Sequence, residues 1–240
     1  MCFTDPNQGV ASADYLAAHA DLGSAIAVIY KNDDNYSSGI TAKFKSEADA
    51  KGLSIVYEGT FDDSNASDFT VQLKKAQDAG ADLLFLPIYY DPASLILTQA
   101  NQMGYAPTIF GVDGMDGILT LEGFDTSLAE GVYLLTPFSA DATDDLTVNF
   151  TKNYKARKDG EVPNQFAADA YDCVYALVAA AEAAGITSDM PYSECCDKLI
   201  AAMQELEYTG LTGTSTWDAT GAVTKEPKVY VIKDGAYAEP

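Results

Sequence analysis

The feature that most constrains this chain is a regular alternation of apolar runs and amphipathic segments over its first 135 residues. Apolar runs of strand length, such as residues 24–30 and 81–89, are each followed by a segment with apolar residues at helical spacing. Ile40, Phe44 and Ala48 show this spacing. A chain that repeats strand and helix in this way builds a parallel sheet with helices on both faces. We therefore predict an α/β fold.

The turns that follow the predicted strands carry the first indication of a site. We expect strands at residues 24–30, 53–61, 81–89, 107–114 (with a turn) and 130–138, and helices at 9–22, 36–52, 68–80 and 92–104. Ligands of parallel α/β sheets bind beyond the carboxyl ends of the strands. The turns expected there, residues 30–39, 86–92 and 110–117, all contain tyrosine or aspartate.

The pattern changes after residue 136. Residues 144–160, 163–185 and 193–208 are predicted to be three helices without a strand between them. The middle helix is apolar over much of its circumference, so we expect it to be deeply covered, yet no sheet is predicted beside it. A turn with a short strand at 211–223 and a closing strand and hairpin at 227–237 complete the chain.

Charge and composition exclude several classes of function. The formal net charge is −22, from 14 basic and 36 acidic residues, which disfavours binding to nucleic acids or to anionic membranes. The only histidine is His19, and the four cysteines do not have metal-finger spacing, so we expect neither a metal nor another cofactor. No segment is long and apolar enough to span a bilayer, and we find no signal peptide.

The sequence also lacks the motifs of common enzymes. Glycine-rich phosphate-binding loops, a G-x-S-x-G serine turn and an H-E-x-x-H zinc motif are all absent. Because the chain has a single histidine, we do not expect a catalytic pair of a nucleophile and a histidine. We predict that the protein is not an enzyme.

Five ordered segments point to a known family. They are TDPNQG (4–9), IAVIYKNDDNYSSG (26–39), DFTVQLKKAQDAGADLLFLPIYY (68–90), FGVDGMDG (110–117) and FAADAYDCVY (166–175). In this combination the chain resembles the type I periplasmic binding proteins that serve branched-chain amino-acid ABC transporters, the Leu/Ile/Val-binding family. It departs from the family pattern at Ser37, where glycine is usual.

The resemblance implies a type I periplasmic-binding-protein fold of two α/β lobes. Residues 1–135 and about 211–240 would form the second lobe nearly whole, and residues 136–210 would be the helical remainder of a first lobe that lacks its N-terminal strands. The expectation is therefore a truncated protein, or one completed by another chain.

The resemblance also implies a solute-binding component of an ABC transporter, which binds a branched-chain or similar amino acid in an inter-lobe cleft and works with the permease and ATPase. The full-length protein would be extracytoplasmic, in the periplasm or as a cell-surface lipoprotein. Carried over by position, Asp113 would receive the ligand's ammonium, Tyr89 would close over it, Tyr36 would line the cleft and Phe166 would contact the ligand's side chain.

Physical chemistry supports these roles for Asp113 and Tyr89, because a buried ammonium needs an opposite charge and hydrogen-bond acceptors. The alternative for Asp113 is a turn aspartate that caps the next helix. Because the carboxylate-binding residues of the first lobe have no counterpart here, we expect the chain alone to bind ligand weakly or not at all.

Two other functions remain open. One is a ligand-sensing receptor domain of the same fold. The other is an interaction module without ligand binding, in which the apolar helices pair in a homodimer or with a complementing chain.

Overall fold

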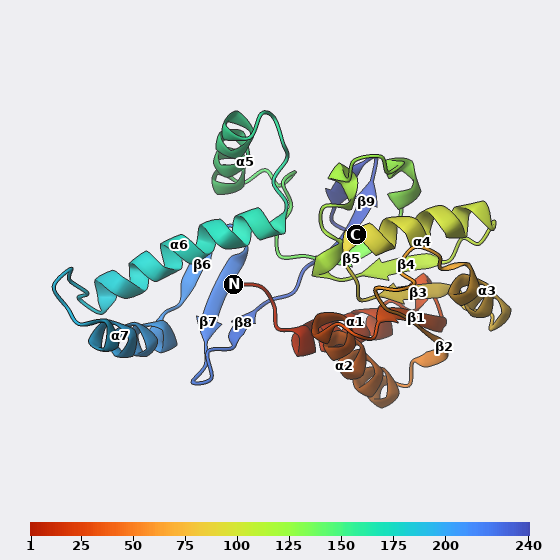
Figure 1. Ribbon diagram of the computed structural model, residues 1–240, viewed down its shortest axis with the longest axis horizontal. Helices are drawn as coiled ribbons and strands as arrows, with labels where there is room; N and C mark the ends of the chain where they lie inside the picture. Colours follow the sequence, from red (N-terminus) through yellow and green to blue (C-terminus); the bar gives the residue numbers. More distant parts are fainter. The chain divides into compact units, whose positions relative to one another are not determined.

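A computed structural model describes all 240 residues, Met1–Pro240. The chain divides into two compact units. The larger unit comprises Asp5–Thr136 and Pro227–Pro240, and the smaller unit comprises Met1–Thr4 and Pro137–Glu226. Each is described by itself below (Figure 1).

The larger unit is built on a seven-stranded sheet in the order β10-β9-β5-β4-β3-β1-β2. β1 to β5 run parallel, and β9 joins β5 in an antiparallel pair that β10 extends. The strands are β1 (Ala25–Lys31), β2 (Ser54–Phe61), β3 (Leu83–Leu86), β4 (Thr108–Gly111), β5 (Tyr133–Leu135), β9 (Val229–Lys233) and β10 (Ala236–Ala238). The predicted alternation of strands and helices is confirmed.

The helices of the larger unit are α1 (Asp5–Ala18), α2 (Asn35–Lys51), α3 (Thr70–Asp78) and α4 (Tyr90–Gln102), with short 3-10 turns η1 (Ala20–Leu22), η2 (Asp113–Met115), η3 (Ile118–Thr120) and η4 (Thr126–Ala129). The first helix begins at Asp5, four residues before the predicted start, because proline is tolerated in the first turn of a helix and Pro6 lies there. This extension places Gln8 on a helix, which matters for the site below.

Two apolar cores cover the two faces of this sheet. α1 and α2 pack on one face, where β1 contributes Ile26 and Val28. α3 and α4 pack on the other face, which takes the alternate residues Ala27 and Ile29. Residues along a strand point to opposite faces in turn, so a strand buried on both faces is apolar throughout. A β-carbon at Gly9 would overlap the backbone of α2, so glycine allows the close approach of α1.

The smaller unit contains a sheet that the sequence pattern did not predict. Its helices are α5 (Asp145–Arg157), α6 (Gln165–Ala183) and α7 (Tyr192–Glu205), and its strands are β6 (Tyr208–Gly210), β7 (Gly213–Trp217) and β8 (Val223–Lys225). The strands form an antiparallel sheet in the order β6-β7-β8. The expectation of helices without a sheet beside them is therefore wrong.

The division of the chain also differs from the expected boundaries at 135/136 and 210/211. Residues 211–226 belong with the smaller unit, because the buried Asp172 carboxylate accepts the Leu211 and Thr212 N–H groups at 2.9 and 2.8 Å. Lys225 adds a buried ion pair with Asp169 at 3.6 Å. Burial lowers the pKa of Lys225, and the Asp169 carboxylate opposes that shift. The first four residues join the same unit.

Helix α6 is not deeply covered, contrary to expectation. Its buried positions include Asp169 and Asp172, while four large apolar or aromatic side chains are half exposed or more: Val174, Tyr175, Leu177 and Val178. The surface of α6 is thus apolar over much of its circumference, as the sequence indicates, but much of this apolar surface faces away from the core of the smaller unit.

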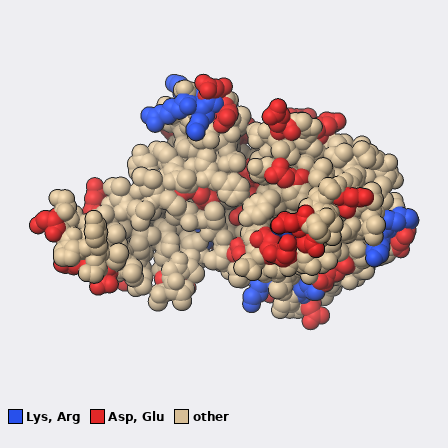
Figure 2. Space-filling model, in the orientation of Figure 1, with Lys and Arg blue, Asp and Glu red and all other residues tan.

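The surface is mainly acidic. Figure 2 shows acidic side chains in scattered groups on the visible face and a group of basic side chains over α5, which contains Lys152, Lys155 and Arg157. None of the helices combines the length and apolarity that crossing a membrane requires.

Candidate functional site

Three predicted site residues meet at the carboxyl edge of the large sheet. Tyr36 lies in the first turn of α2 after β1, Tyr89 precedes α4 after β3, and Asp113 follows β4. β4, β3 and β1 are neighbours in the sheet, so parallel pairing brings the three turns side by side. We call Tyr36, Tyr89 and Asp113 the carboxylate–tyrosine cluster.

Asp113 is held by a short hydrogen bond. The Tyr36 hydroxyl donates to Asp113 Oδ1 at 2.5 Å, and the same hydroxyl accepts the Gly114 N–H at 2.8 Å. Asp113 is only 4% exposed. It is the first residue of η2, and the N-cap position before it is Val112.

Tyr89 supplies an accessible ring beside this carboxylate. Its ring stacks on that of Tyr36 with centroids 4.7 Å apart and planes at 26°, and the residue is 45% exposed. Its neighbour Tyr90 instead packs against the core beneath α4. A β-carbon at Gly114 would lie 2.6 Å from the Tyr36 hydroxyl and 3.1 Å from the Tyr89 ring, so glycine allows the turn to approach both tyrosines.

Burial and charge keep Tyr36 protonated. Its pKa is raised well above the ordinary value, first because burial disfavours the phenolate and then because the Asp113 carboxylate lies beside it. The phenol therefore acts as a permanent donor to Asp113 at physiological pH.

Ser37 joins two of the three loops. Its buried hydroxyl donates to the Pro87 carbonyl at 2.6 Å and accepts the Lys31 N–H at 2.9 Å. The end of β1, the first turn of α2 and the turn before Tyr89 are thus tied through one oxygen. Glycine, which is usual at this position in the family pattern, cannot make either bond.

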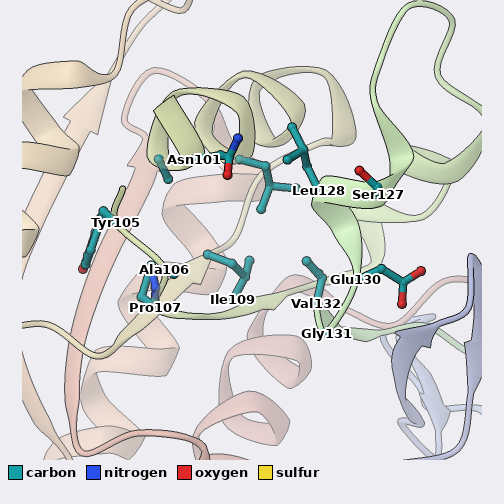
Figure 3. A pocket seen from close by; sticks show the side chains of 12 residues that line it. Asn101, Tyr105, Ala106, Pro107, Ile109, Ser127, Leu128, Glu130, Gly131 and Val132 are labelled. Carbon is teal, nitrogen blue, oxygen red and sulfur yellow. The ribbon is translucent and has the colours of Figure 1, made fainter. Parts of the chain in front are cut away.

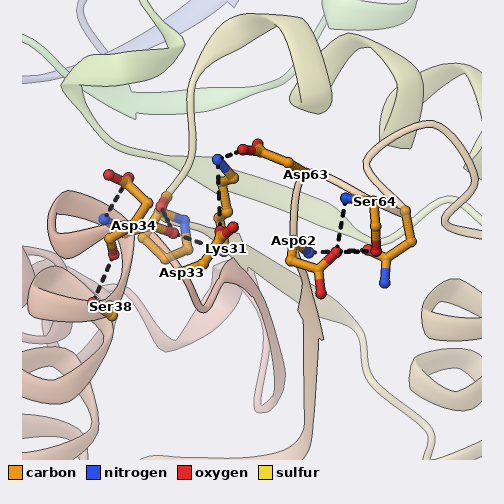
Figure 4. A network of polar contacts seen from close by, with 10 residues as sticks. Lys31, Asp33, Asp34, Ser38, Asp62, Asp63 and Ser64 are labelled. Carbon is orange, nitrogen blue, oxygen red and sulfur yellow. Dashed lines mark hydrogen bonds and ion pairs between the residues drawn. The ribbon is translucent and has the colours of Figure 1, made fainter.

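Charged residues link the loops that follow β1 and β2 (Figure 4). Lys31 Nζ lies 2.5 Å from Asp63 and 3.6 Å from Asp33, and the Asp34 carboxylate caps α2 by accepting the Ser37 N–H at 3.1 Å. Asp33 and Asp63 are exposed, and Lys31 and Asp34 are half-buried, so we interpret these groups as restraints on the loop.

A second buried carboxyl group follows in the same turn. Asp116 accepts a hydrogen bond from the Tyr237 hydroxyl at 2.9 Å, and that hydroxyl lies 3.4 Å from the Gly117 nitrogen as acceptor. Tyr237 comes from β10, so the closing hairpin buttresses the segment that carries Asp113.

Phe166, the fourth predicted residue, is half-buried near the start of α6 in the smaller unit. The cluster of the larger unit does not include it. Its role as a ligand contact stays a prediction.

Sequence reasoning missed the supporting groups of the cluster. Gln8 accepts the Asp113 N–H at 3.2 Å through its side-chain oxygen, across 105 residues of chain. Gln8 and Ser37 both stood inside motifs that were recognised, but nothing in their local sequence signals a contact so distant along the chain.

A separate hollow lies at the opposite strand ends. It measures about 240 Å³ and is lined by Tyr105–Pro107, which precede β4, and by residues 127, 128 and 130–132, which precede β5 (Figure 3). Its lining includes the apolar side chains of Ile109 and Val132, and its Glu130 carboxylate accepts the Asp234 and Gly235 N–H groups at 2.9 and 2.6 Å. It therefore lies away from the carboxylate–tyrosine cluster.

No group of three or more His, Cys, Asp or Glu side chains is placed to hold a metal ion, and no disulfide bond joins any of the four cysteines. The carboxylate–tyrosine cluster combines a buried carboxylate, a phenol that orients it and an accessible aromatic ring.

Comparisons with known proteins agree with this description. A family model for periplasmic binding proteins matches residues 1–236. The Leu/Ile/Val-binding protein homolog 8 of Brucella abortus is 30% identical over 138 residues, which cover 55% of this chain and 34% of that protein.

Solved structures match over almost the whole chain. A leucine-binding protein from Thermotoga maritima has a TM-score of 0.79 at 25% identity, covering 99% of this chain and 65% of its own. A branched-chain amino acid transporter substrate-binding protein from Streptococcus pneumoniae, in complex with isoleucine, has a TM-score of 0.82 at 26% identity, covering 98% and 64%. This chain thus spans less than two thirds of the solved relatives and about a third of the Brucella protein.

These matches confirm the resemblance and the type I α/β fold. Proteins of the family and the solved neighbours are solute-binding proteins; they bind small molecules, work with ABC transporters and are extracytoplasmic. The chain belongs to the periplasmic binding protein family and is related to the branched-chain amino-acid binding proteins of ABC transporters.

Proposed function

We propose that this chain is the amino-acid-binding component, or part of it, of an ABC transporter, and that the carboxylate–tyrosine cluster receives the ligand's ammonium group. The observation that carries the proposal is a buried carboxylate, bonded to a protonated phenol and next to a half-exposed aromatic ring.

The cluster has the chemistry that an ammonium needs. A buried cation requires an opposite charge, which Asp113 supplies, because desolvation is otherwise too unfavourable. A carboxylate accepts several hydrogen bonds at once, so the bond from Tyr36 does not prevent it from accepting an ammonium N–H. The exposed ring of Tyr89 adds a cation–π contact.

A branched-chain amino acid is the ligand that the relatives favour. One solved relative is a leucine-binding protein and another holds isoleucine. In the whole protein, we propose that Phe166 contacts the ligand's side chain, that a permease and an ATPase are the partners, and that the protein works outside the cytoplasm.

The test is ligand-observed NMR by saturation transfer, which detects binding as weak as the millimolar range. Leucine, isoleucine, valine and polar amino acids are compared with 4-methylpentanoate, which is leucine without its ammonium. The Asp113→Asn variant is compared with Asp49→Asn, which makes the same change at an exposed position on α2.

Saturation transfer to leucine, isoleucine or valine but not to 4-methylpentanoate is expected, with loss in Asp113→Asn and retention in Asp49→Asn. Equal transfer to leucine and 4-methylpentanoate, or transfer unaffected by Asp113→Asn, contradicts the ammonium role. Absence of transfer for every amino acid contradicts ligand binding by this chain.

The exposed face of α6 favours a second candidate function, self-association. Val174, Leu177 and Val178 follow helical spacing, and no charged side chain lies between Val174 and Val178. Such a stripe can pack against its own symmetry mate, because a two-fold interface uses the same face twice. We propose a second copy of this chain as its occupant.

Size-exclusion chromatography with light scattering tests this candidate between micromolar and high micromolar concentration. A dimer that the Leu177→Lys variant dissociates supports it, and Lys43→Ala on the exposed face of α2 serves as the control variant. A monomer at every concentration contradicts it.

A further inference from the structure

Gln8 is a buried polar residue whose position calls for an explanation. It lies on α1, is only 1% exposed, and is one of few polar side chains in the interior of the larger unit. Its Oε1 accepts the Asp113 N–H at 3.2 Å. Its Nε2 is buried without a hydrogen-bond partner. An unpaired buried donor is unfavourable, so the amide is kept at a cost that an apolar side chain of the same size avoids.

The bond to Asp113 fixes how the amide is oriented. Turning the group over would place the Nε2 donors against the Asp113 N–H, which is also a donor. The oxygen of Gln8 is therefore the atom that contacts the turn, and the unpaired Nε2 follows from that choice.

The helix that carries Gln8 is a firm support. α1 packs closely on α2 through Gly9, where a β-carbon would overlap the α2 backbone. From this support Gln8 holds the main chain of Asp113, while Tyr36 holds its carboxylate. The two bonds reach Asp113 from different elements and restrain different parts of the residue.

We propose that Gln8 is a positioning residue for ligand binding: by holding the Asp113 N–H, it sets the direction in which the Asp113 carboxylate meets the ligand's ammonium. The ligand role of Asp113 rests on the proposed function above. The positioning of Asp113 by Gln8 does not rest on that function, because the bond between Tyr36 and Asp113 reports it in the absence of a ligand.

Substitutions at Gln8 distinguish the effect of losing the hydrogen-bond acceptor from the effect of changing the packing of the side chain. Gln8→Met keeps the length of the side chain and removes the acceptor. Gln8→Asn is one methylene shorter, so its oxygen falls short of the turn. Gln102→Met is the control, because it makes the same glutamine-to-methionine change at an exposed position at the end of α4.

The readout is the NMR signal of the Tyr36 ζ carbon in protein with 13C-labelled tyrosine, identified by its absence in Tyr36→Phe. This signal responds to the hydrogen bond that the phenol donates. We expect it to move in Gln8→Met and in Gln8→Asn, and to keep its wild-type position in Gln102→Met. Leucine affinity should fall about fivefold in Gln8→Met, as the loss of one neutral hydrogen bond predicts.

An unchanged Tyr36 signal in folded Gln8→Met overturns the inference. If Gln8→Met does not fold, the Tyr36 signal is measured in Gln8→Asn instead, and an unchanged signal there overturns the inference in the same way. A Tyr36 signal that moves as expected in a protein that binds no leucine supports the positioning of Asp113 and contradicts the proposed function, so the two failures are distinguishable.

Discussion

Replacing Tyr36 by phenylalanine tests the geometry of the cluster with the removal of one oxygen atom. The ring that stacks on Tyr89 remains, and the bonds to Asp113 Oδ1 at 2.5 Å and from the Gly114 N–H at 2.8 Å are lost. A bond to an ionised group contributes about 1.5–3 kcal/mol, and an unpaired buried N–H is unfavourable by about 1–3 kcal/mol. Partial relaxation leaves an expected destabilisation of about 2–4 kcal/mol, or about 5–10 °C in Tm.

The pH dependence of this difference gives a second, independent check. The pKa of Tyr36 is raised above its ordinary value of about 10, mainly by burial and then by the Asp113 charge. A pKa that is higher in the folded state gives a contribution that is complete below the unfolded pKa and is lost as pH rises above it. The stability advantage of wild type over Tyr36→Phe should thus be constant up to about pH 9 and shrink above about pH 10.

Urea denaturation followed by circular dichroism at several pH values measures both quantities, and the other tyrosines cancel because both proteins contain them. A Tyr36→Phe variant as stable as wild type at pH 7, or a difference that does not change above pH 10, would refute the short bond between Tyr36 and Asp113 and the burial of the phenol.

Three further variants test other parts of the structure by the same denaturation assay. Ser37→Ala removes the oxygen that ties two loops of the site and should destabilise the protein by about 1–3 kcal/mol; an unchanged midpoint argues against the tie. Gly210→Ala places a β-carbon against the buried Asp172 carboxylate and should destabilise by about 1–3 kcal/mol, whereas a neutral effect shows that β6 lies elsewhere. Asp144→Ala removes the cap that accepts the Thr147 N–H at 2.9 Å and should destabilise by about 1 kcal/mol at pH 7. That bond lowers the pKa of Asp144, so its contribution is present above the ordinary pKa and lost in acid, and a loss equal at pH 7 and pH 2 contradicts it.

The large sheet and its cluster could be predicted because they depend on short-range patterns. Apolar strands buried on both faces stand out from the amphipathic helices between them, and parallel pairing brings the strand ends together. The strand pattern indicated the turns, and the resemblance to the family singled out Tyr36, Tyr89 and Asp113 within them; the order of neighbours in the sheet then brings these turns together. The bond between Gln8 and Asp113 depends on the exact packing of α1, which periodicity does not contain.

The smaller unit was harder to predict because its strands are short and its interior contains charged side chains. β6 to β8 are three to five residues long and rich in threonine, serine and glycine, so they lack the apolar runs that indicate strands. Asp172 lies on α6 and accepts a hydrogen bond from the Leu211 N–H beside the sheet. Aspartate is usually exposed to solvent, yet Asp172 is fully buried. On α6, the amount of apolar surface was visible in the sequence, but which side it faces was not.

A crystal structure of the chain grown with leucine, at a concentration set by the NMR titration, tests the central claim most directly. The account predicts the ammonium nitrogen within hydrogen-bonding distance of the Asp113 carboxylate, beneath the Tyr89 ring, with the Tyr36 bond to Asp113 retained. Leucine bound elsewhere, or bound with its carboxylate toward Asp113, would contradict it.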